Sequence, residues 1–245
     1  VCRNPMPLNR YGQPIGESLL HRDQPPHLTA VPILGNFCRL EPIDANRHAD
    51  DLWDAFAEAS DDRGWTYLSS GPFADRDTFR AWVDEMSEEF YSPFWAVVVA
   101  DKACGFGCYL AISPTHFSLE IGHLHFAPRL SRTPAATEAL HLWIENAFAL
   151  GYRRVEWKCD VLNAPSRRAA RRLGFSFEGI FRNHRRFRGH NRDTAWYAIV
   201  EEDWPALRAI HRAWLDPANF DEAGIQRFRL SERTSGLRRP DPVDR

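Results

Sequence analysis

The stretch RLSRTPAATEALHLWIENAFALG, residues 129–151, decides the fold class. Thr133 is a favourable helix N-cap, Pro134 suits the first helical turn, and Gly151 is typical of a position just beyond a helix C-terminus. Between them, apolar side chains recur at helical spacing: Leu140, Trp143, Ile144, Ala147 and Phe148. The pattern predicts a long buried helix, entered through a short basic loop.

Strand and helix patterns alternate on both sides of this helix, which predicts an α/β domain built on one mixed sheet with helices on both faces. Residues 1–35 are expected to form an extended arm, 36–204 the domain, and 205–245 a C-terminal helix and polar tail. The expected strands lie at 37–43, 94–100, 104–112, 117–126, 154–161, 177–187 and 192–200, and the further helices follow Asp44, Asp75, Pro165 and Trp204.

Composition and charge exclude several broad classes of protein. The 245 residues carry a formal net charge of -2, so no overall field attracts nucleic acid or membrane. No apolar run approaches the roughly 20 residues of a membrane-spanning helix. An odd number of cysteines without scaffold-like spacing predicts reduced thiols and a soluble, cytoplasmic protein: Cys2, Cys38, Cys104, Cys108 and Cys159.

A series of short motifs resembles the GNAT superfamily of acetyltransferases, and more narrowly the branch that contains the ribosomal-protein N-terminal acetyltransferases. The likeness covers about residues 36–204. It implies a mostly antiparallel sheet with one parallel strand pair at the cofactor cleft, and acetyl transfer from acetyl-CoA to a primary amine. The motifs are Glu120-Ile121-Gly122, Pro128, Arg132, Thr137-Glu138-Ala139, Asn163-Ala164-Pro165-Ser166 and Leu173-Gly174-Phe175, followed by Gly179, Arg182, Gly189 and Arg192-Asp193-Thr194.

The resemblance also implies where acetyl-CoA binds. Free amides and the positive end of the helix dipole form an anion site at residues 131–136, which would hold the diphosphate. Thr133 and Pro134 stand where the family usually has glycines, and Pro134 supplies no amide, so an ordinary capped helix is the alternative interpretation. The implied cofactor contacts are Leu124, Phe126, Arg129, Ser131, Arg132, Thr133, Ala135, Ala136, Asn163 and Ser166.

Direct attack of an amine on the thioester requires a base, an oxyanion site and a proton for the departing thiolate. Backbone amides near residues 124–126 are expected to serve the oxyanion, and Ser166 the thiolate. Glu120 and His123 are the candidate bases, and strict strand alternation places His123 and His125 on the face opposite Glu120. The two histidines could instead bind zinc, but no third ligand lies nearby, and we expect no metal.

Other residues leave alternatives open. Trp53, Trp65 and Tyr67 fit either a core or a wall of the acceptor cleft. The arginines at 167, 168, 171 and 172 could meet cofactor phosphate, an acidic acceptor or solvent, of which solvent is the expectation. Arginines interleaved with phenylalanines from residue 167 to 192 also fit an RNA-binding module, and a degenerate loop fits a noncatalytic CoA-binding protein.

The acceptor stays undefined at this point, because the resemblance includes enzymes that act on protein N-termini, small amines and antibiotics. We expect acetyl-CoA and an amine as partners, without membrane or nucleic acid. A homodimer is left open.

Overall fold

The computed structural model describes residues 7–239 and Asp241, and Cys2 lies outside these residues. Eight strands form one sheet in the order β1-β2-β3-β4-β5-β6-β8-β7, and only β5 and β6 run parallel. The predicted mixed α/β sheet is therefore confirmed. The strands are β1 (Ile33–Leu34), β2 (Arg39–Pro42), β3 (Phe94–Val99), β4 (Lys102–Ser113), β5 (Ser118–Phe126), β6 (Arg154–Asp160), β7 (Ser176–Phe187) and β8 (His190–Val200).

Four of the six α-helices in the described residues begin where a side chain accepts from one of their first free amides. Asp44 accepts from the amides of Asn46 and Arg47 at 2.8 and 3.0 Å, and Asp75 forms a capping box with Thr78. The helices are α1 (Ala45–Phe56), α2 (Arg76–Ser87), α3 (Pro134–Ala149), α4 (Ala164–Arg172), α5 (Trp204–Leu215) and α6 (Leu230–Thr234), with short 3-10 turns at η1 (Asp62–Trp65), η2 (Pro114–His116) and η3 (Pro217–Asn219).

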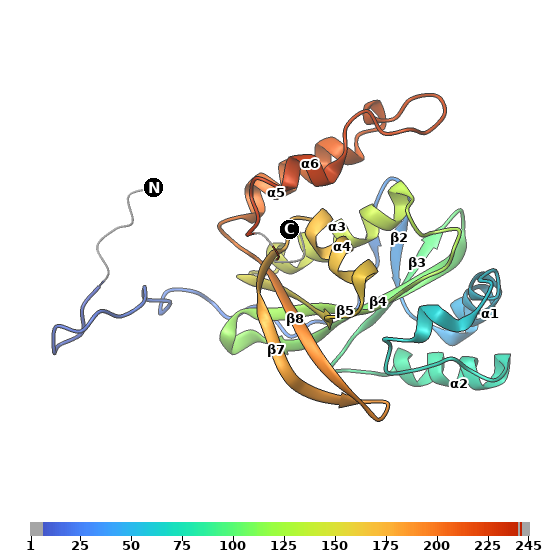
Figure 1. Ribbon diagram of the computed structural model, residues 1–245, viewed down its shortest axis with the longest axis horizontal. Coiled ribbons are helices and arrows are strands. Elements are labelled where there is room, and N and C mark those ends of the chain that lie inside the picture. Colours follow the sequence, from blue (N-terminus) through green and yellow to red (C-terminus); the bar gives the residue numbers. More distant parts are fainter. Residues whose placement is uncertain (1–6, 240, 242–245) are drawn as a thin grey trace.

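The sheet separates two hydrophobic cores. Helices α3 to α6 lie together on one face, and α1 and α2 lie apart from them beside β3 and β4 (Figure 1). Trp143 of α3 and Leu207 of α5 belong to the larger core, whereas Leu52 of α1 and Val83 of α2 belong to the smaller one. A strand residue can therefore be assigned to a face by the core that it joins.

An extra residue interrupts the regular pleat of β5. Gly122 pairs with Cys108 but His125 pairs with Phe106, so β5 uses three steps where β4 uses two. His123 adopts the left-handed φ of 51° at this point. Such a bulge bends the strand and changes which face the following side chains occupy.

The chain ends pack against the domain to different extents. The N-terminal arm extends away from the body of the molecule (Figure 1), but Leu28 is buried in the larger core. The C-terminal segment buries Trp214 and Leu230 in the same core, and Asp241 forms a buried ion pair of 2.6 Å with Arg167. Among the described residues, no helix combines the length and the apolar character needed to cross a membrane.

Candidate active site

A cavity of about 1280 Å³ opens where the parallel strands separate. β5 and β6 pair only from Ser118 with Arg154 to Glu120 with Glu156. Beyond these pairs, β5 continues along β4 and β6 continues along β8, and the cavity is lined by the separated halves of both strands. Helices α3 and α4 add Ala136 and Ser166 to its wall.

The loop that enters α3 carries backbone donors that no described acceptor uses, and Arg132 and Ala136 of this segment line the cavity. Thr133 caps α3 by accepting from the amide of Ala136 at 3.2 Å, and its own hydroxyl donates to the Leu130 carbonyl at 2.6 Å. The amides of Arg132 and Ala135 donate to no acceptor among the described residues. Two free amides at a helix N-terminus can bind one anionic group.

The two arginines of the loop point in different directions. Arg132 lines the cavity and adopts the left-handed φ of 65°, which turns the chain into α3. Arg129 does not line it, because its guanidinium pairs with Glu58 at the end of α1 and donates to the Ala103 carbonyl at 3.4 Å. Of the two expected phosphate contacts, the structure brings only Arg132 to the cavity.

Glu138, from the Thr137-Glu138-Ala139 motif, has a structural role. Its buried carboxylate accepts from the amides of Asn36, Phe37 and Cys38 at 2.8, 2.6 and 2.9 Å. These bonds join the first turn of α3 to the turn between β1 and β2. Glu138 therefore fixes the start of α3 and does not face the cavity.

Ser166 is held by a neighbouring indole. The Trp157 Nε1–H group donates to the Ser166 hydroxyl oxygen at 2.9 Å, and Asn163 caps α4 by accepting from the Ser166 amide at 3.1 Å. Both Asn163 and Ser166 line the cavity. Because the Ser166 oxygen accepts this bond, its own proton is left for donation to another group.

Glu120 lies at the point where β5 and β6 part. The Lys158 ammonium lies 3.1 Å from Glu120 and 2.6 Å from Glu156, and it also lies over the ring of Trp196. Burial raises the pKa of Glu120 above its ordinary value of 4.5, and the Lys158 charge opposes that rise. A partly desolvated carboxylate of this kind is a stronger base than an exposed one.

The structure places His123 and His125 on the same face as Glu120, not on the opposite face as strand alternation predicts. Leu119 and Ile121 join the larger core before the bulge, and Leu124 and Phe126 contact it afterwards. The inserted residue shifts the alternation, so the two histidines pack against aromatic rings of the smaller core. Both contact the ring of Phe106. His123 also packs on Trp82 and Phe94, and His125 on Phe56 and Trp65.

Both histidines are neutral near pH 7. Burial lowers the pKa of His123 to about 4, and burial together with the adjacent His123 lowers that of His125 to about 4. His123 Nε2 lies 2.8 Å from the Ser70 hydroxyl. Within residues 7–239 and 241, no group of three or more His, Cys, Asp or Glu side chains could hold a metal ion.

The aromatic and basic residues with open roles are divided by the structure. Trp65 is buried and Trp53 packs on Phe79, whereas Tyr67 lines the cavity. The sequence around these three residues does not predict which of them lines the cavity.

The arginines of α4 are likewise divided, and the expectation of solvent exposure is wrong for three of them, since the Arg171 side chain is only 14% exposed and lies 4.0 Å from Asp241. Arg167 is buried against Tyr197 and Asp241. Arg172 lines the cavity, donates to the Thr137 hydroxyl at 3.0 Å and lies 4.7 Å from the ring of Trp214. It forms no ion pair with any described residue, and sequence periodicity alone did not single it out.

Comparison with known proteins agrees with this architecture. A family model described as Acetyltransferase (GNAT) domain matches residues 39–176. A crystal structure of a GCN5-related N-acetyltransferase from Brucella melitensis is 41% identical, with a TM-score of 0.86 over 89% of this chain and 100% of that chain. The chain therefore belongs to the GNAT acetyltransferase family.

Two further relatives extend the comparison. The protein named Uncharacterized N-acetyltransferase YnaD, from Bacillus subtilis, is 28% identical over 156 residues, which cover 62% of this chain and 89% of YnaD. The structure titled RimL, a ribosomal L7/L12 alpha-N-protein acetyltransferase, is 20% identical with a TM-score of 0.60, over 70% of this chain and 94% of that chain. At this identity the likeness to RimL shows a shared fold.

Proposed function

We propose that the protein transfers the acetyl group of acetyl-CoA to a primary amine by direct attack. The observation that carries the proposal is the cavity between the separated halves of β5 and β6, which is lined both by Arg132 at the entry to α3 and by Glu120. A diphosphate fits the amides of Arg132 and Ala135 and the Arg132 guanidinium. The pantetheine arm would then run past Leu124, Phe126 and Asn163.

The chemical roles follow from the positions of the polar groups. The amine nitrogen attacks the thioester carbonyl carbon while backbone amides near Leu124 to Phe126 stabilise the oxyanion. The carbon–sulfur bond then breaks, and the departing thiolate takes the proton of the Ser166 hydroxyl. A water molecule then reprotonates the Ser166 oxygen. The proton lost by the amine passes through water to Glu120, which returns it to solvent.

Glu120 is favoured over His123 as the base. The pKa of His123 lies near 4 and its Nε2 is engaged with Ser70, so the imidazole is a weak proton acceptor at neutral pH. Glu120 has a raised pKa and lines the cavity. In this proposal His123 supports the bulge and the aromatic wall.

The test is release of free thiol from acetyl-CoA in the presence of N-terminal peptides, polyamines, amino acids and aminoglycosides. We expect at least one amine to accelerate release, and Glu120→Gln to lower kcat by about a hundredfold while the affinity for acetyl-CoA persists. Thermal stabilisation by acetyl-CoA without accelerated thiol release from any amine would instead identify a noncatalytic CoA-binding protein.

A further inference from the structure

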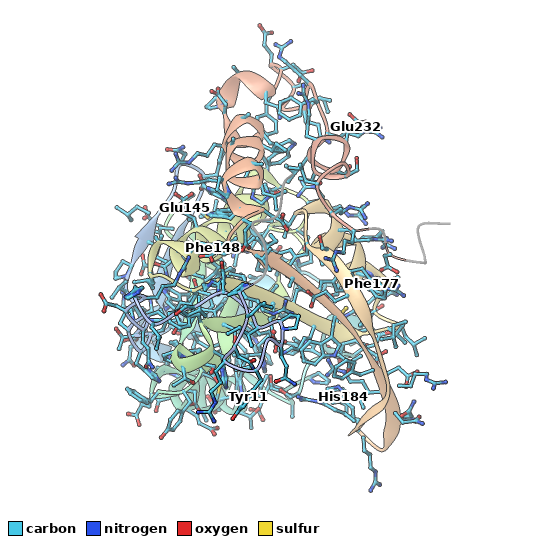
Figure 2. The ribbon with its side chains drawn as sticks, turned by 90° about the vertical axis from the view of Figure 1, so that its left-hand side faces the viewer. Tyr11, Glu145, Phe148, Phe177, His184 and Glu232 are labelled. Carbon is cyan, nitrogen blue, oxygen red and sulfur yellow. The ribbon has the colours of Figure 1, made fainter. Side chains whose placement is uncertain are left out.

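The hairpin formed by β7 and β8 carries several arginines that form no ion pair with the described residues. Figure 2 shows this hairpin projecting from the body, with Phe177 near its root and His184 towards its tip. Elsewhere, arginines such as Arg76 and Arg153 pair with carboxylates. Among the described residues, no ion pair involves the hairpin arginines Arg182, Arg185, Arg186, Arg188 and Arg192.

Two of these arginines face each other directly. Arg185 and Arg192 are Cα partners in the β7–β8 ladder. Like charges at directly opposed positions destabilise a strand pair unless an anion lies between them. In addition, the Arg192 Nε atom is buried and has no hydrogen-bond partner within the described chain. The pair therefore offers guanidinium donors that can bind an anionic group.

The Arg185–Arg192 pair lies on the acceptor side of the cavity. Both side chains line it together with Lys158, and the Arg185 charge acts on Glu120. The tip of the hairpin is attached across the cavity, because Arg188 Nη2 donates to the carbonyls of Leu68, Ser70 and Gly71. The proposed diphosphate seat lies instead at the N-terminus of α3.

We infer that the acceptor is an acidic polypeptide, with carboxylates bound by Arg185 and Arg192 and its terminal amine beside Glu120. This inference rests on the proposed N-acetyltransferase function. The arginines from Arg182 in β7 to Arg188 in the turn beyond it extend over at most roughly 20 Å, at about 3.3 Å per residue, which exceeds the reach of a small dicarboxylate. RNA is the less favoured ligand because it offers no aliphatic amine to a thioester.

The inference is tested with short peptides that have free N-termini and carry glutamate, glutamine or lysine at the same inner positions. We expect kcat/KM for the glutamate peptide to exceed that for the glutamine peptide by about tenfold at low salt and to fall as salt is added. In Arg185→Ala/Arg192→Ala the two values should become about equal. Arg76→Ala, which removes an arginine outside the cavity, should keep the preference.

Fluorescence anisotropy with the labelled glutamate peptide provides a readout that needs no turnover. Tighter binding to the wild type than to the double variant would support the inference even if no amine releases thiol, a result that would contradict only the proposed function. Equal kcat/KM for all three peptides, acetylation of free acidic amino acids in place of peptides, or tighter binding of single-stranded RNA than of the glutamate peptide would each overturn it.

Discussion

At the scale of single residues, the hydroxyl of Ser166 has the clearest assignment. Its oxygen accepts from the Trp157 indole, which leaves its proton for the thiolate. We predict that Ser166→Ala lowers kcat by at least about tenfold, with a smaller change in the dissociation constant of acetyl-CoA. Thiol-release kinetics and calorimetry measure the two quantities. A kcat equal to that of the wild type would remove Ser166 from the mechanism.

Arg132 should give the reverse pattern. Arg132→Ala removes a charged partner of the diphosphate, so we expect acetyl-CoA to bind about tenfold more weakly while kcat at saturation is nearly unchanged. Arg129→Ala is the matched control, because Arg129 lies in the same loop but pairs with Glu58. Equal effects of the two substitutions on affinity would contradict the role of Arg132.

At the scale of elements, the bulge in β5 depends on a glycine in the neighbouring strand. A Cβ atom on Gly107 would lie 2.5 Å from Leu124 Cδ2 and 2.9 Å from the buried ring of Trp143. We predict that Gly107→Ala lowers the free energy of unfolding by about 1 to 3 kcal/mol and weakens acetyl-CoA binding, because Leu124 must move within the cavity wall.

Urea unfolding and calorimetry check this prediction. Gly236→Ala is the control, since a Cβ atom at Gly236 would meet open space. If Gly107→Ala has the stability and affinity of that control, Leu124 is not held as the structure implies.

The elements were largely predictable from sequence, because caps and apolar periodicity are local signals. Thr133, Asp44 and Asp75 each cap the predicted helix, and the strands predicted at 177–187 and 192–200 pair with each other as β7 and β8. The strands predicted at 94–100 and 104–112 leave residues 101–103 for their turn, but the turn lies at Ala100-Asp101, where both residues have positive φ. A shift of one residue costs little in local sequence preference, so sequence alone could not resolve it.

The site was less predictable, since its geometry depends on register and on distant partners. Arg129 resembles Arg132 in sequence context, but its guanidinium pairs with the carboxylate of Glu58, 71 residues away in sequence, and therefore points away from the cavity. Asp241 buries Arg167 in the same way from the far end of the chain. Alternation failed at His123 because nothing in the local residue types requires a bulge there.

At the scale of the whole molecule, buried neutral histidines make stability depend on pH. Burial lowers the pKa of His123 and His125 to about 4 and that of His211 to about 3, from an ordinary 6.5. Between pH 6.5 and 4 these histidines are protonated in the unfolded chain but stay neutral in the folded chain. We predict that the free energy of unfolding falls steadily as the pH is lowered from 6.5 to 4, by on the order of 3 kcal/mol for each such histidine.

Urea unfolding at a series of pH values measures the slope. His125→Phe should reduce the slope of the free energy of unfolding against pH by the equivalent of about one bound proton, because phenylalanine makes the same aromatic contacts without titrating. His116 is exposed, and His116→Asn should leave the slope unchanged. Identical slopes for the wild type and His125→Phe would show that this imidazole is not kept neutral by burial.

The inserted residue at His123 has a consequence for any attempt to shorten or graft this strand. Deleting one amino acid there would restore an uninterrupted pleat and keep the following side chains on their present faces, whereas regular pairing of the undeleted strand would send the imidazoles to the other side of the sheet from Glu120. A sequence alignment that matches this strand without a gap to one lacking the extra residue would therefore equate side chains that point in opposite directions.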